Sequence, residues 1–216
     1  MDYEEHKKFF ETAYRTGSDV WTNLSMKDRG ALLMKELPKD SLILEVGSGR
    51  GLFSKKLVEN GYRVIGIDSE PNIVRKTNEE IKDLGYEGKL KFVEADALDL
   101  PFTDHSFDGV CDFGLMENLY KEDWGTYVNE ISRVLKPGGF YLNTSLSSET
   151  LQFLDFHPKV SNGGEFQKYG MNYYFFNKDE IKDIFKHELT PIEQNIEFVD
   201  RPDEFALLET LFKKPE

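Results

Sequence analysis

The amino-acid sequence predicts an α/β fold in which a mostly parallel sheet carries helices on both faces. A short apolar run at residues 42–46 breaks into glycines at alternate positions, and apolar residues at helical spacing follow at 52–58. Strand, tight turn and helix in this order form the opening unit of a doubly wound sheet. Further short apolar runs at residues 63–67, 89–94 and 107–112 recur at the spacing of βαβ units, which favours parallel strands.

Residues 1–40 are expected to form a helical segment that precedes the sheet. Phe9, Phe10, Ala13 and Tyr14 recur at helical spacing. Packing against the core is the favoured interpretation of these side chains, and an aromatic lid over a ligand is the alternative.

The turn after the first apolar run has the pattern Glu45-x-Gly47-x-Gly49-x-Gly51. Glycine at such a junction permits positive φ and lets a ligand approach the backbone where a Cβ would block it. A dinucleotide fingerprint requires Gly-x-Gly-x-x-Gly, but Leu52 stands at the position of its third glycine. The turn therefore predicts a nucleotide-type cofactor other than a dinucleotide, with a plain structural turn as the alternative.

An acid ends the second apolar run, 21 residues after Gly47. A carboxylate at Asp68 can accept hydrogen bonds from two neighbouring ribose hydroxyls, as the acid in dinucleotide folds does. Its alternative role is to begin the following helix, where an acid is favourable. The third run leads to Asp96, which is either a second ligand contact or solvated surface.

Together these features resemble the class I methyltransferases that use S-adenosylmethionine. The glycine turn is similar to the first motif of that family, and the Phe-Asp start of residues 107–112 is similar to its fourth strand. The sequence Leu-Lys-Pro-Gly-Gly at 135–139 matches the turn that enters its fifth strand. The resemblance covers roughly residues 40–212, with the specific motifs inside 42–140. It implies a Rossmann-like class I methyltransferase fold, a seven-stranded mostly parallel sheet with an antiparallel last strand.

The resemblance also implies S-adenosylmethionine as cofactor and a set of residues that bind it. In the family, an acid at the position of Asp96 accepts from the adenine amino group, and the adjacent backbone contacts a ring nitrogen. An aromatic side chain from the N-terminal segment closes over the sulfonium, favoured by cation–π attraction, and a basic residue meets the methionine carboxylate. The expected cofactor-binding residues are Tyr14, Arg15, Trp21, Glu45, Gly47, Ser48, Gly49, Gly51, Asp68, Ser69, Asp96, Ala97, Asp112 and Phe113.

The exit of the fourth strand, residues 112–118, lies beside the methyl donor in this fold. Many relatives have a histidine where this chain has Asn118, so a ready imidazole base is missing there. Glu117 or Asp112 could replace it, and each is equally well explained as a helix-start acid or an orienting acceptor. Because proximity and alignment supply ~7–11 kcal/mol, a thiol or amine acceptor needs no dedicated base. No catalytic residue is assigned.

One domain is expected over residues 1–216, and after the helical segment it divides into three further segments. Residues 41–145 hold the cofactor half, and 146–176 are expected to form an irregular aromatic insertion, with glycines near 163 as hinges of a second lid or simply as part of a surface loop. In 177–216, Asn177 and Glu180 have the spacing of a capping box, which predicts a helix. Two strands, 192–199 and 205–212, are expected to complete the sheet as a hairpin.

Composition restricts the partners of the protein. The net charge is −13, with no dense basic stripe, which disfavours nucleic acid as a substrate. No apolar stretch approaches the ~20 residues of a membrane span, and the N-terminus lacks the layout of a signal peptide. The single cysteine, Cys111, excludes an internal disulfide and is expected to pack in the core, in keeping with a cytoplasmic protein. The four histidines lack metal-type pairing, so no metal is expected. The oligomeric state is not predicted.

The expected function is transfer of a methyl group by in-line displacement to an N, O or S atom of a small molecule. The alternatives are a methyltransferase acting on a protein or RNA group and a non-catalytic S-adenosylmethionine-binding protein. A nicotinamide oxidoreductase is opposed by Leu52 in the glycine turn. An aminopropyltransferase with a decarboxylated cofactor shares the fold and remains open.

Overall fold

The computed structural model describes residues 3–17, 29–161, 163–199 and 205–216. In this part of the chain the strands are β1 (Leu42–Val46), β2 (Arg63–Asp68), β3 (Leu90–Glu94), β4 (Phe107–Phe113), β5 (Leu135–Leu146), β6 (Gly164–Lys168), β7 (Met171–Phe175), β8 (Thr190–Phe198) and β9 (Ala206–Lys213). The helices are α1 (Glu4–Thr16), α2 (Ala31–Glu36), α3 (Leu52–Glu59), α4 (Pro71–Lys82), α5 (Trp124–Val134), α6 (Pro158–Ser161) and α7 (Lys178–Phe185), with 3-10 turns η2 (Met116–Asn118) and η3 (Lys121–Asp123). No described helix is both long and apolar enough to cross a membrane.

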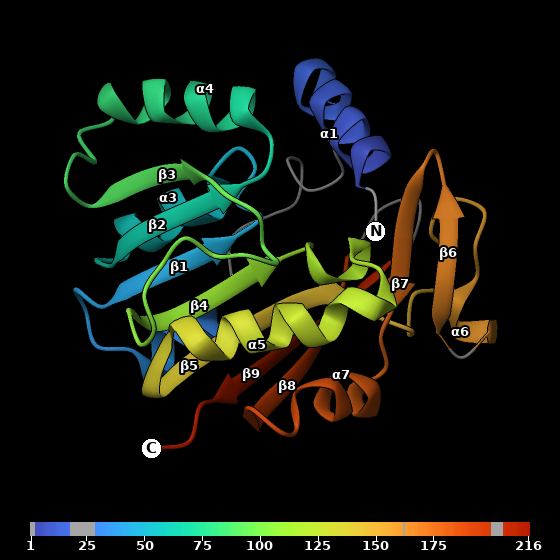
Figure 1. Ribbon diagram of the computed structural model, residues 1–216. Helices are drawn as coiled ribbons and strands as arrows, with labels where there is room; N and C mark the ends of the chain where they lie inside the picture. The colour runs from blue at the N-terminus through green and yellow to red at the C-terminus, as the bar shows by residue number, and fades with distance from the viewer. Residues whose placement is uncertain (1–2, 18–28, 162, 200–204) are drawn as a thin grey trace.

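The central sheet has seven strands in the order β3-β2-β1-β4-β5-β9-β8 (Figure 1). The strands from β3 to β5 pair in parallel, and β9 runs antiparallel to both of its neighbours. The order reverses at β1, whose two neighbours are β2 and β4, and ligands of open α/β sheets bind at such a switch point. The predicted sheet, with its antiparallel last strand, is confirmed.

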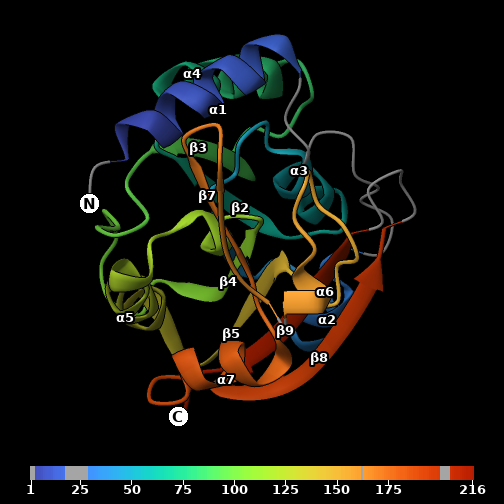
Figure 2. The same ribbon diagram turned by 90° about the vertical axis from the view of Figure 1, so that its right-hand side faces the viewer.

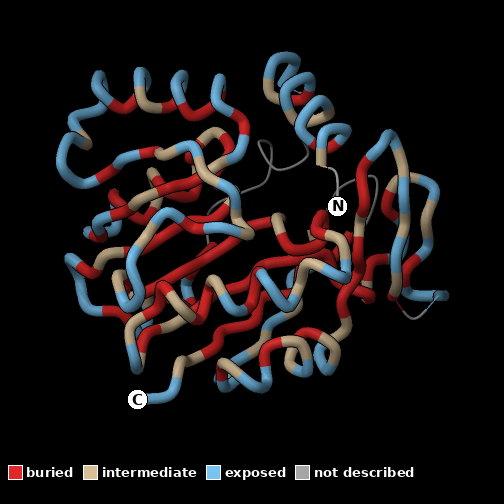
Figure 3. The backbone as a smooth tube through the Cα atoms, viewed as in Figure 1, coloured by how far each residue is buried: buried red, intermediate tan, exposed pale blue. Residues whose placement is uncertain are grey.

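Apolar side chains on both faces of the sheet build two core clusters, and the buried residues are concentrated in its strands (Figure 3). Because side chains alternate along a strand, Ile43 joins the cluster beneath α2, α3 and α4, while Leu44 joins the cluster beneath α5 and α7. Cys111 packs in the first cluster and is fully buried. The helices predicted on both faces are therefore present.

The segment predicted to be irregular, 146–176, contains an antiparallel hairpin of β6 and β7 (Figure 1), of which Figure 2 labels β7. Its aromatic residues form one packed group: the rings of Phe156 and Phe166 stack 5.0 Å apart, and Phe153 lies 5.3 Å from Tyr173. β7 is buried along almost its whole length, and its sequence Met-Asn-Tyr-Tyr-Phe lacks the apolar–polar alternation that predicts a half-buried strand. This is why the strand was not expected.

The Pro-Gly-Gly turn predicted before the fifth strand lies inside β5. The pairing with β4 shifts between Phe107, opposite Leu135, and Gly109, opposite Phe140. The residues between Leu135 and Phe140 therefore form a bulge, with Gly138 at φ 73°. The predicted capping box at the start of α7 is confirmed: Asn177 accepts from the Glu180 N–H, and the Glu180 carboxylate accepts from the Asn177 N–H.

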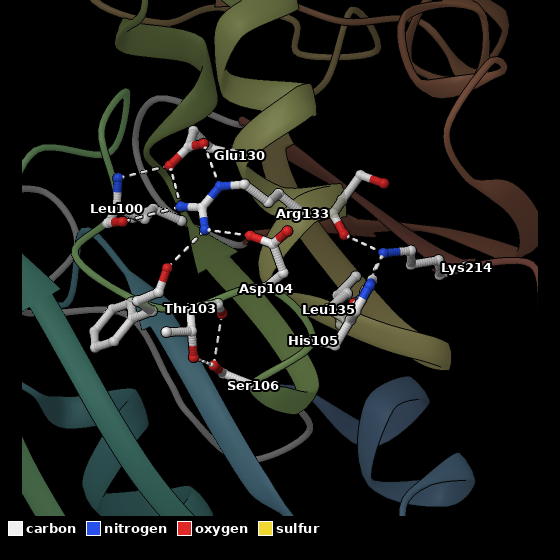
Figure 4. A network of polar contacts seen from close by, with 11 residues as sticks. Leu100, Thr103, Asp104, His105, Ser106, Glu130, Arg133, Leu135 and Lys214 are labelled. Atoms are coloured by element: carbon white, nitrogen blue, oxygen red, sulfur yellow. Dashed lines mark hydrogen bonds and ion pairs between the residues drawn. The ribbon is translucent and has the colours of Figure 1, made fainter.

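A polar network fixes the long loop between β3 and β4 to helix α5 (Figure 4). The Arg133 guanidinium donates to the carbonyls of Phe102 (2.6 Å) and Leu100 (3.0 Å), and it also pairs with Glu130. Glu130 in turn accepts from the Leu100 N–H at 2.7 Å. The same loop begins with Ala95 and Asp96, which line the cavity described next, so this network holds the loop that forms one of its walls.

Candidate active site

A cavity of about 340 Å³ opens at the carboxyl ends of β1, β2 and β4, beneath helix α1. Figure 1 shows α1 lying beyond these strand ends, over the point where the strand order reverses. Of the predicted cofactor-binding residues, the following line the cavity: Tyr14, Glu45, Gly47, Ser48, Gly49, Asp68, Ser69, Asp96, Ala97 and Phe113. The fold thus gathers side chains from five separate stretches of the sequence at one site.

The glycine turn lets two side chains come close to its backbone. Gly47 and Gly49 have φ of 73° and 48°, in the left-handed region that favours glycine. A Cβ at Gly49 would lie 2.9 Å from the Tyr14 hydroxyl, and a Cβ at Gly47 would lie 3.2 Å from Leu115. The Arg50 guanidinium donates to the Tyr14 carbonyl, which ties the turn to α1. The turn is therefore a bare backbone surface with Tyr14 and Leu115 on either side.

Asp68 ends β2 on the wall of the cavity and is half-buried. Its Oδ2 accepts from the Gly49 N–H at 2.9 Å and its Oδ1 accepts from the Glu70 N–H at 3.0 Å. Burial raises the pKa of this carboxyl to about 6, and the backbone donors oppose that rise. Each carboxylate oxygen has a second acceptor site, so Asp68 holds the glycine turn in place while it offers acceptors to a diol.

Glu45 is a buried carboxyl at the carboxyl end of β1, and it also lines the cavity. The Ser54 hydroxyl donates to it. Burial raises its pKa from an ordinary value of 4.5 to about 8. A cationic group that enters the cavity would favour the ionised form of Glu45, because an opposite charge nearby stabilises a carboxylate.

Trp21 lies outside the described residues. Arg15 is exposed on α1 and is not part of the cavity wall, while Arg50 is. The difference arises from helix geometry: Arg15 follows Tyr14 by one residue and therefore points to a different side of the helix.

Gly51 supports the fold beneath the cavity and does not line it. It precedes α3 with φ of 65°, and a Cβ there would lie 2.3 Å from the Phe92 ring. The third glycine of the motif is therefore needed for close packing of the turn against β3. Its expected contact with the cofactor is not seen in the wall of the cavity.

Asp112 points away from the cavity, to the opposite face of the sheet. It accepts hydrogen bonds from the hydroxyls of Tyr127 (2.6 Å) and Tyr141 and from the Asn143 amide (3.2 Å). Burial raises its pKa to about 6, and these donors oppose the rise. Because side chains alternate along a strand, only the neighbouring Phe113 faces the cavity.

Several residues of the cavity wall were not predicted from the sequence. Glu70 caps α4, accepting from the N–H groups of Asn72 (3.1 Å) and Ile73 (2.7 Å). An acid directly before a proline is a helix-start signal that could have identified it. Gly114, Leu115 and Asn118 belong to the exit of the fourth strand, which was expected beside the methyl donor, and Phe10 to the aromatic residues for which a lid was the alternative.

The remaining residues of the wall, for which the sequence offers no comparable signal, are Tyr3, Glu4, His6, Lys7, Arg50, Leu52, Phe53, Ile67, Ala95, Leu98 and Leu119.

The residues present fit S-adenosylmethionine. Ser48 places a buried hydroxyl on the wall, and this hydroxyl has no hydrogen-bond partner among the described residues. The bare turn at Gly47 and Gly49 suits the methionine portion, Asp68 suits the ribose and Asp96 suits the adenine amino group. Glu45 adds a carboxyl for the cationic groups of the ligand. An orphaned hydroxyl, a bare backbone surface and acidic walls together describe a site for a cationic nucleoside.

A family model described as a methyltransferase domain matches residues 44–143. The ubiquinone/menaquinone biosynthesis C-methyltransferase UbiE of Pseudomonas fluorescens is 33% identical over 126 residues, which cover 56% of this chain and 48% of that protein. The demethylmenaquinone methyltransferase of Staphylococcus aureus is 32% identical over 155 residues, which cover 70% of this chain and 54% of that protein. The chain therefore spans about half the length of the curated relatives it matches.

Solved structures with the same fold cover nearly the whole chain. A Burkholderia thailandensis 1,6-didemethyltoxoflavin-N1-methyltransferase, with 1,6-didemethyltoxoflavin and S-adenosylhomocysteine bound, has a TM-score of 0.82 at 22% identity, covering 98% of this chain and 88% of that one. The N-methyltransferase NodS of Bradyrhizobium japonicum, in complex with S-adenosylhomocysteine, has a TM-score of 0.74 at 18% identity, covering 99% of this chain and 100% of that one. At these identities the likeness establishes the fold.

Proposed function

We propose that this chain, which belongs to the class I S-adenosylmethionine-dependent methyltransferases, transfers a methyl group to a small organic molecule. Nitrogen, oxygen and sulfur are the acceptor atoms expected from the sequence. Because the relatives include C-methyltransferases, carbon is a further possible acceptor atom. The acceptor would enter beneath α1, beside the exit of β4.

The observation that carries this proposal is the coupling of Asp68 to the glycine turn. The Asp68 carboxylate accepts a hydrogen bond from the Gly49 N–H and also faces the cavity. The proposed ribose site at Asp68 and the proposed methionine site at the glycine turn are therefore joined by a hydrogen bond. The neighbouring Asp96 accepts from the Leu98 N–H at 2.9 Å, which orders the start of the loop expected to hold adenine. A plain structural turn would have no need of two acids in the wall of a cavity.

The residues of the chain bind, orient and exclude water. S-adenosylmethionine supplies a methyl group that is already activated, because its leaving group is a neutral thioether. Tyr14 and Phe10 on α1 cover the cavity and restrict solvent, which strengthens electrostatic attraction to Glu45 and Asp68. Holding the acceptor beside Phe113 then provides the proximity and alignment that such a displacement requires.

A small acceptor is favoured over a macromolecule by charge and by enclosure. The chain carries a net charge of −13, which opposes binding to nucleic acid. Helix α1 lies over the cavity and leaves less room for a macromolecule to approach it than for a small molecule. A cytoplasmic location and a single domain over the whole chain remain predictions.

Calorimetric titration with S-adenosylmethionine, S-adenosylhomocysteine and NADH tests the proposal. We expect micromolar binding of the first two and no binding of NADH. Asp68→Ala should weaken S-adenosylhomocysteine binding by ~1.5–3 kcal/mol, the range for hydrogen bonds to a charged group. Asp83→Ala, at the exposed end of α4, is the matched control and should bind as the wild type does.

Each contrary result has a distinct meaning. Binding of NADH alone would refute the interpretation of the glycine spacing. Normal affinity in Asp68→Ala would refute the site. Binding of S-adenosylmethionine with no turnover over a broad panel of acceptors would favour the non-catalytic alternative.

A further inference from the structure

One end of the cavity is organised around the main chain of a single residue, Asn172 in β7. Its N–H donates to Nε2 of His6 at 3.3 Å, and its carbonyl accepts from Nδ2 of Asn118 at 2.7 Å. His6 belongs to α1 and Asn118 to η2, and both are buried and line the cavity. Three segments far apart in the sequence thus meet at the two main-chain polar groups of one residue.

These two hydrogen bonds determine which atoms His6 and Asn118 leave for a ligand. Burial lowers the pKa of His6, so the ring is neutral near pH 7. A neutral ring that accepts at Nε2 carries its proton at Nδ1 and is a donor there. Asn118, having committed its amide nitrogen to a carbonyl, has Oδ1 as an acceptor. Among the described residues, neither Nδ1 of His6 nor Oδ1 of Asn118 has a further hydrogen-bond partner.

Neighbouring contacts hold the His6 ring in this orientation. It stacks on Tyr120 with ring centres 5.3 Å apart, and the Tyr3 ring meets it edge-on at 5.3 Å. Tyr3 is itself fixed, because its hydroxyl donates to Asp123 at 2.7 Å and accepts from the Tyr120 N–H at 3.1 Å. The stack therefore fixes the plane of the ring, and the hydrogen bond from the Asn172 N–H fixes which edge of the ring faces β7.

A neutral donor and a neutral acceptor at one end of the cavity select the chemistry of the ligand. We propose that His6 and Asn118 determine acceptor specificity by binding a planar, uncharged molecule that carries a hydrogen-bond acceptor and a donor on the same edge. A ring amide, with C=O beside N–H, has this pattern, as has an enol beside a carbonyl. His6 donates to the carbonyl and Asn118 accepts from the N–H or O–H. The apolar side chains of Phe10, Leu115 and Leu119 supply the walls that suit a planar ring.

This inference rests on the proposed function, since the molecule would bind beside the methyl donor. The probes are 2-quinolone, a planar ring amide, and N-methyl-2-quinolone, in which the donor is blocked. Both are titrated by ligand-observed NMR against the protein saturated with S-adenosylhomocysteine. We expect wild-type protein to bind 2-quinolone at least about tenfold more tightly than its N-methyl form, because an unmatched buried polar group is costly.

Two variants separate the roles of the pair. His6→Phe keeps an aromatic ring against Tyr120 but removes the donor, so both probes should weaken by about tenfold while their ratio persists. Asn118→Leu removes the acceptor, so the ratio between the two probes should fall toward one.

The titration with S-adenosylhomocysteine is the control for each protein. If the wild type binds it but does not distinguish the two probes, or binds neither, the specificity pair is refuted and the proposed function stands. If the wild type fails to bind S-adenosylhomocysteine at all, the proposed function itself is refuted. The comparison of the two probes on wild-type protein needs no variant, so it decides the matter even if a variant does not fold.

Discussion

Replacing Glu45 with glutamine should change how the stability of the free protein depends on pH. Burial raises the Glu45 pKa from 4.5 to about 8, so between these values the folded protein holds a proton that the unfolded chain releases. The unfolding free energy therefore falls as pH rises, by about 1.36 kcal/mol per pH unit for this one group. Glutamine is neutral throughout and can still accept from the Ser54 hydroxyl.

The expected magnitude is large enough to measure. From about pH 5 to about pH 7.5, Glu45 costs the wild type about 3 kcal/mol of unfolding free energy that the variant does not lose. Below about pH 4 both side chains are neutral in the folded and the unfolded protein, and the two proteins should be equally stable. Glu45→Gln should therefore be the more stable protein at neutral pH, by roughly this amount.

Urea unfolding at several pH values, with free energies extrapolated to water, measures the difference. Glu94→Gln is the matched control, because Glu94 is an exposed residue at the end of the neighbouring strand β3. It should lose stability with pH in parallel with the wild type. If Glu45→Gln does the same, Glu45 does not hold a proton in the folded protein and the electrostatic account of the site is refuted.

Three further predictions follow from the geometry. Because the pKa of Asp68 is about 6 and ribose hydroxyls donate to the charged carboxylate, S-adenosylhomocysteine should bind about fourfold more tightly at pH 7.5 than at pH 5.5, measured by calorimetry; unchanged affinity would contradict this. Gly51→Ala should lower the unfolding free energy by ~1–3 kcal/mol, since its Cβ would lie 2.3 Å from Phe92. Gly49→Ala should mainly weaken cofactor binding. If Gly49→Ala and Gly51→Ala lowered the unfolding free energy equally, the assignment of Gly49 to the cavity and of Gly51 to packing would be refuted. Cys111 should react with a maleimide only after unfolding, because burial raises its pKa and covers the thiol; rapid labelling of native protein would be inconsistent with its packing.

The sequence by itself determined the sheet, the glycine turn and the acids that follow the strands. Each of these features depends on residues close together in the chain, whose spacing records strand, turn and helix. Glu45, Gly49 and Asp68 could be assigned to one edge because parallel strands end at the same side of a sheet. The composition of the turn also distinguished the cofactor, through Leu52 at the position of a dinucleotide glycine.

Only the tertiary structure decided which side chains reach the cavity. Asp112 and Phe113 are neighbours, yet alternation places one against Tyr127 and the other in the site. His6 meets Asn172 across 166 residues, a contact that no local pattern encodes. The physical reason is that spacing fixes the direction of a side chain relative to its own element, whereas a site is made where separate elements pack.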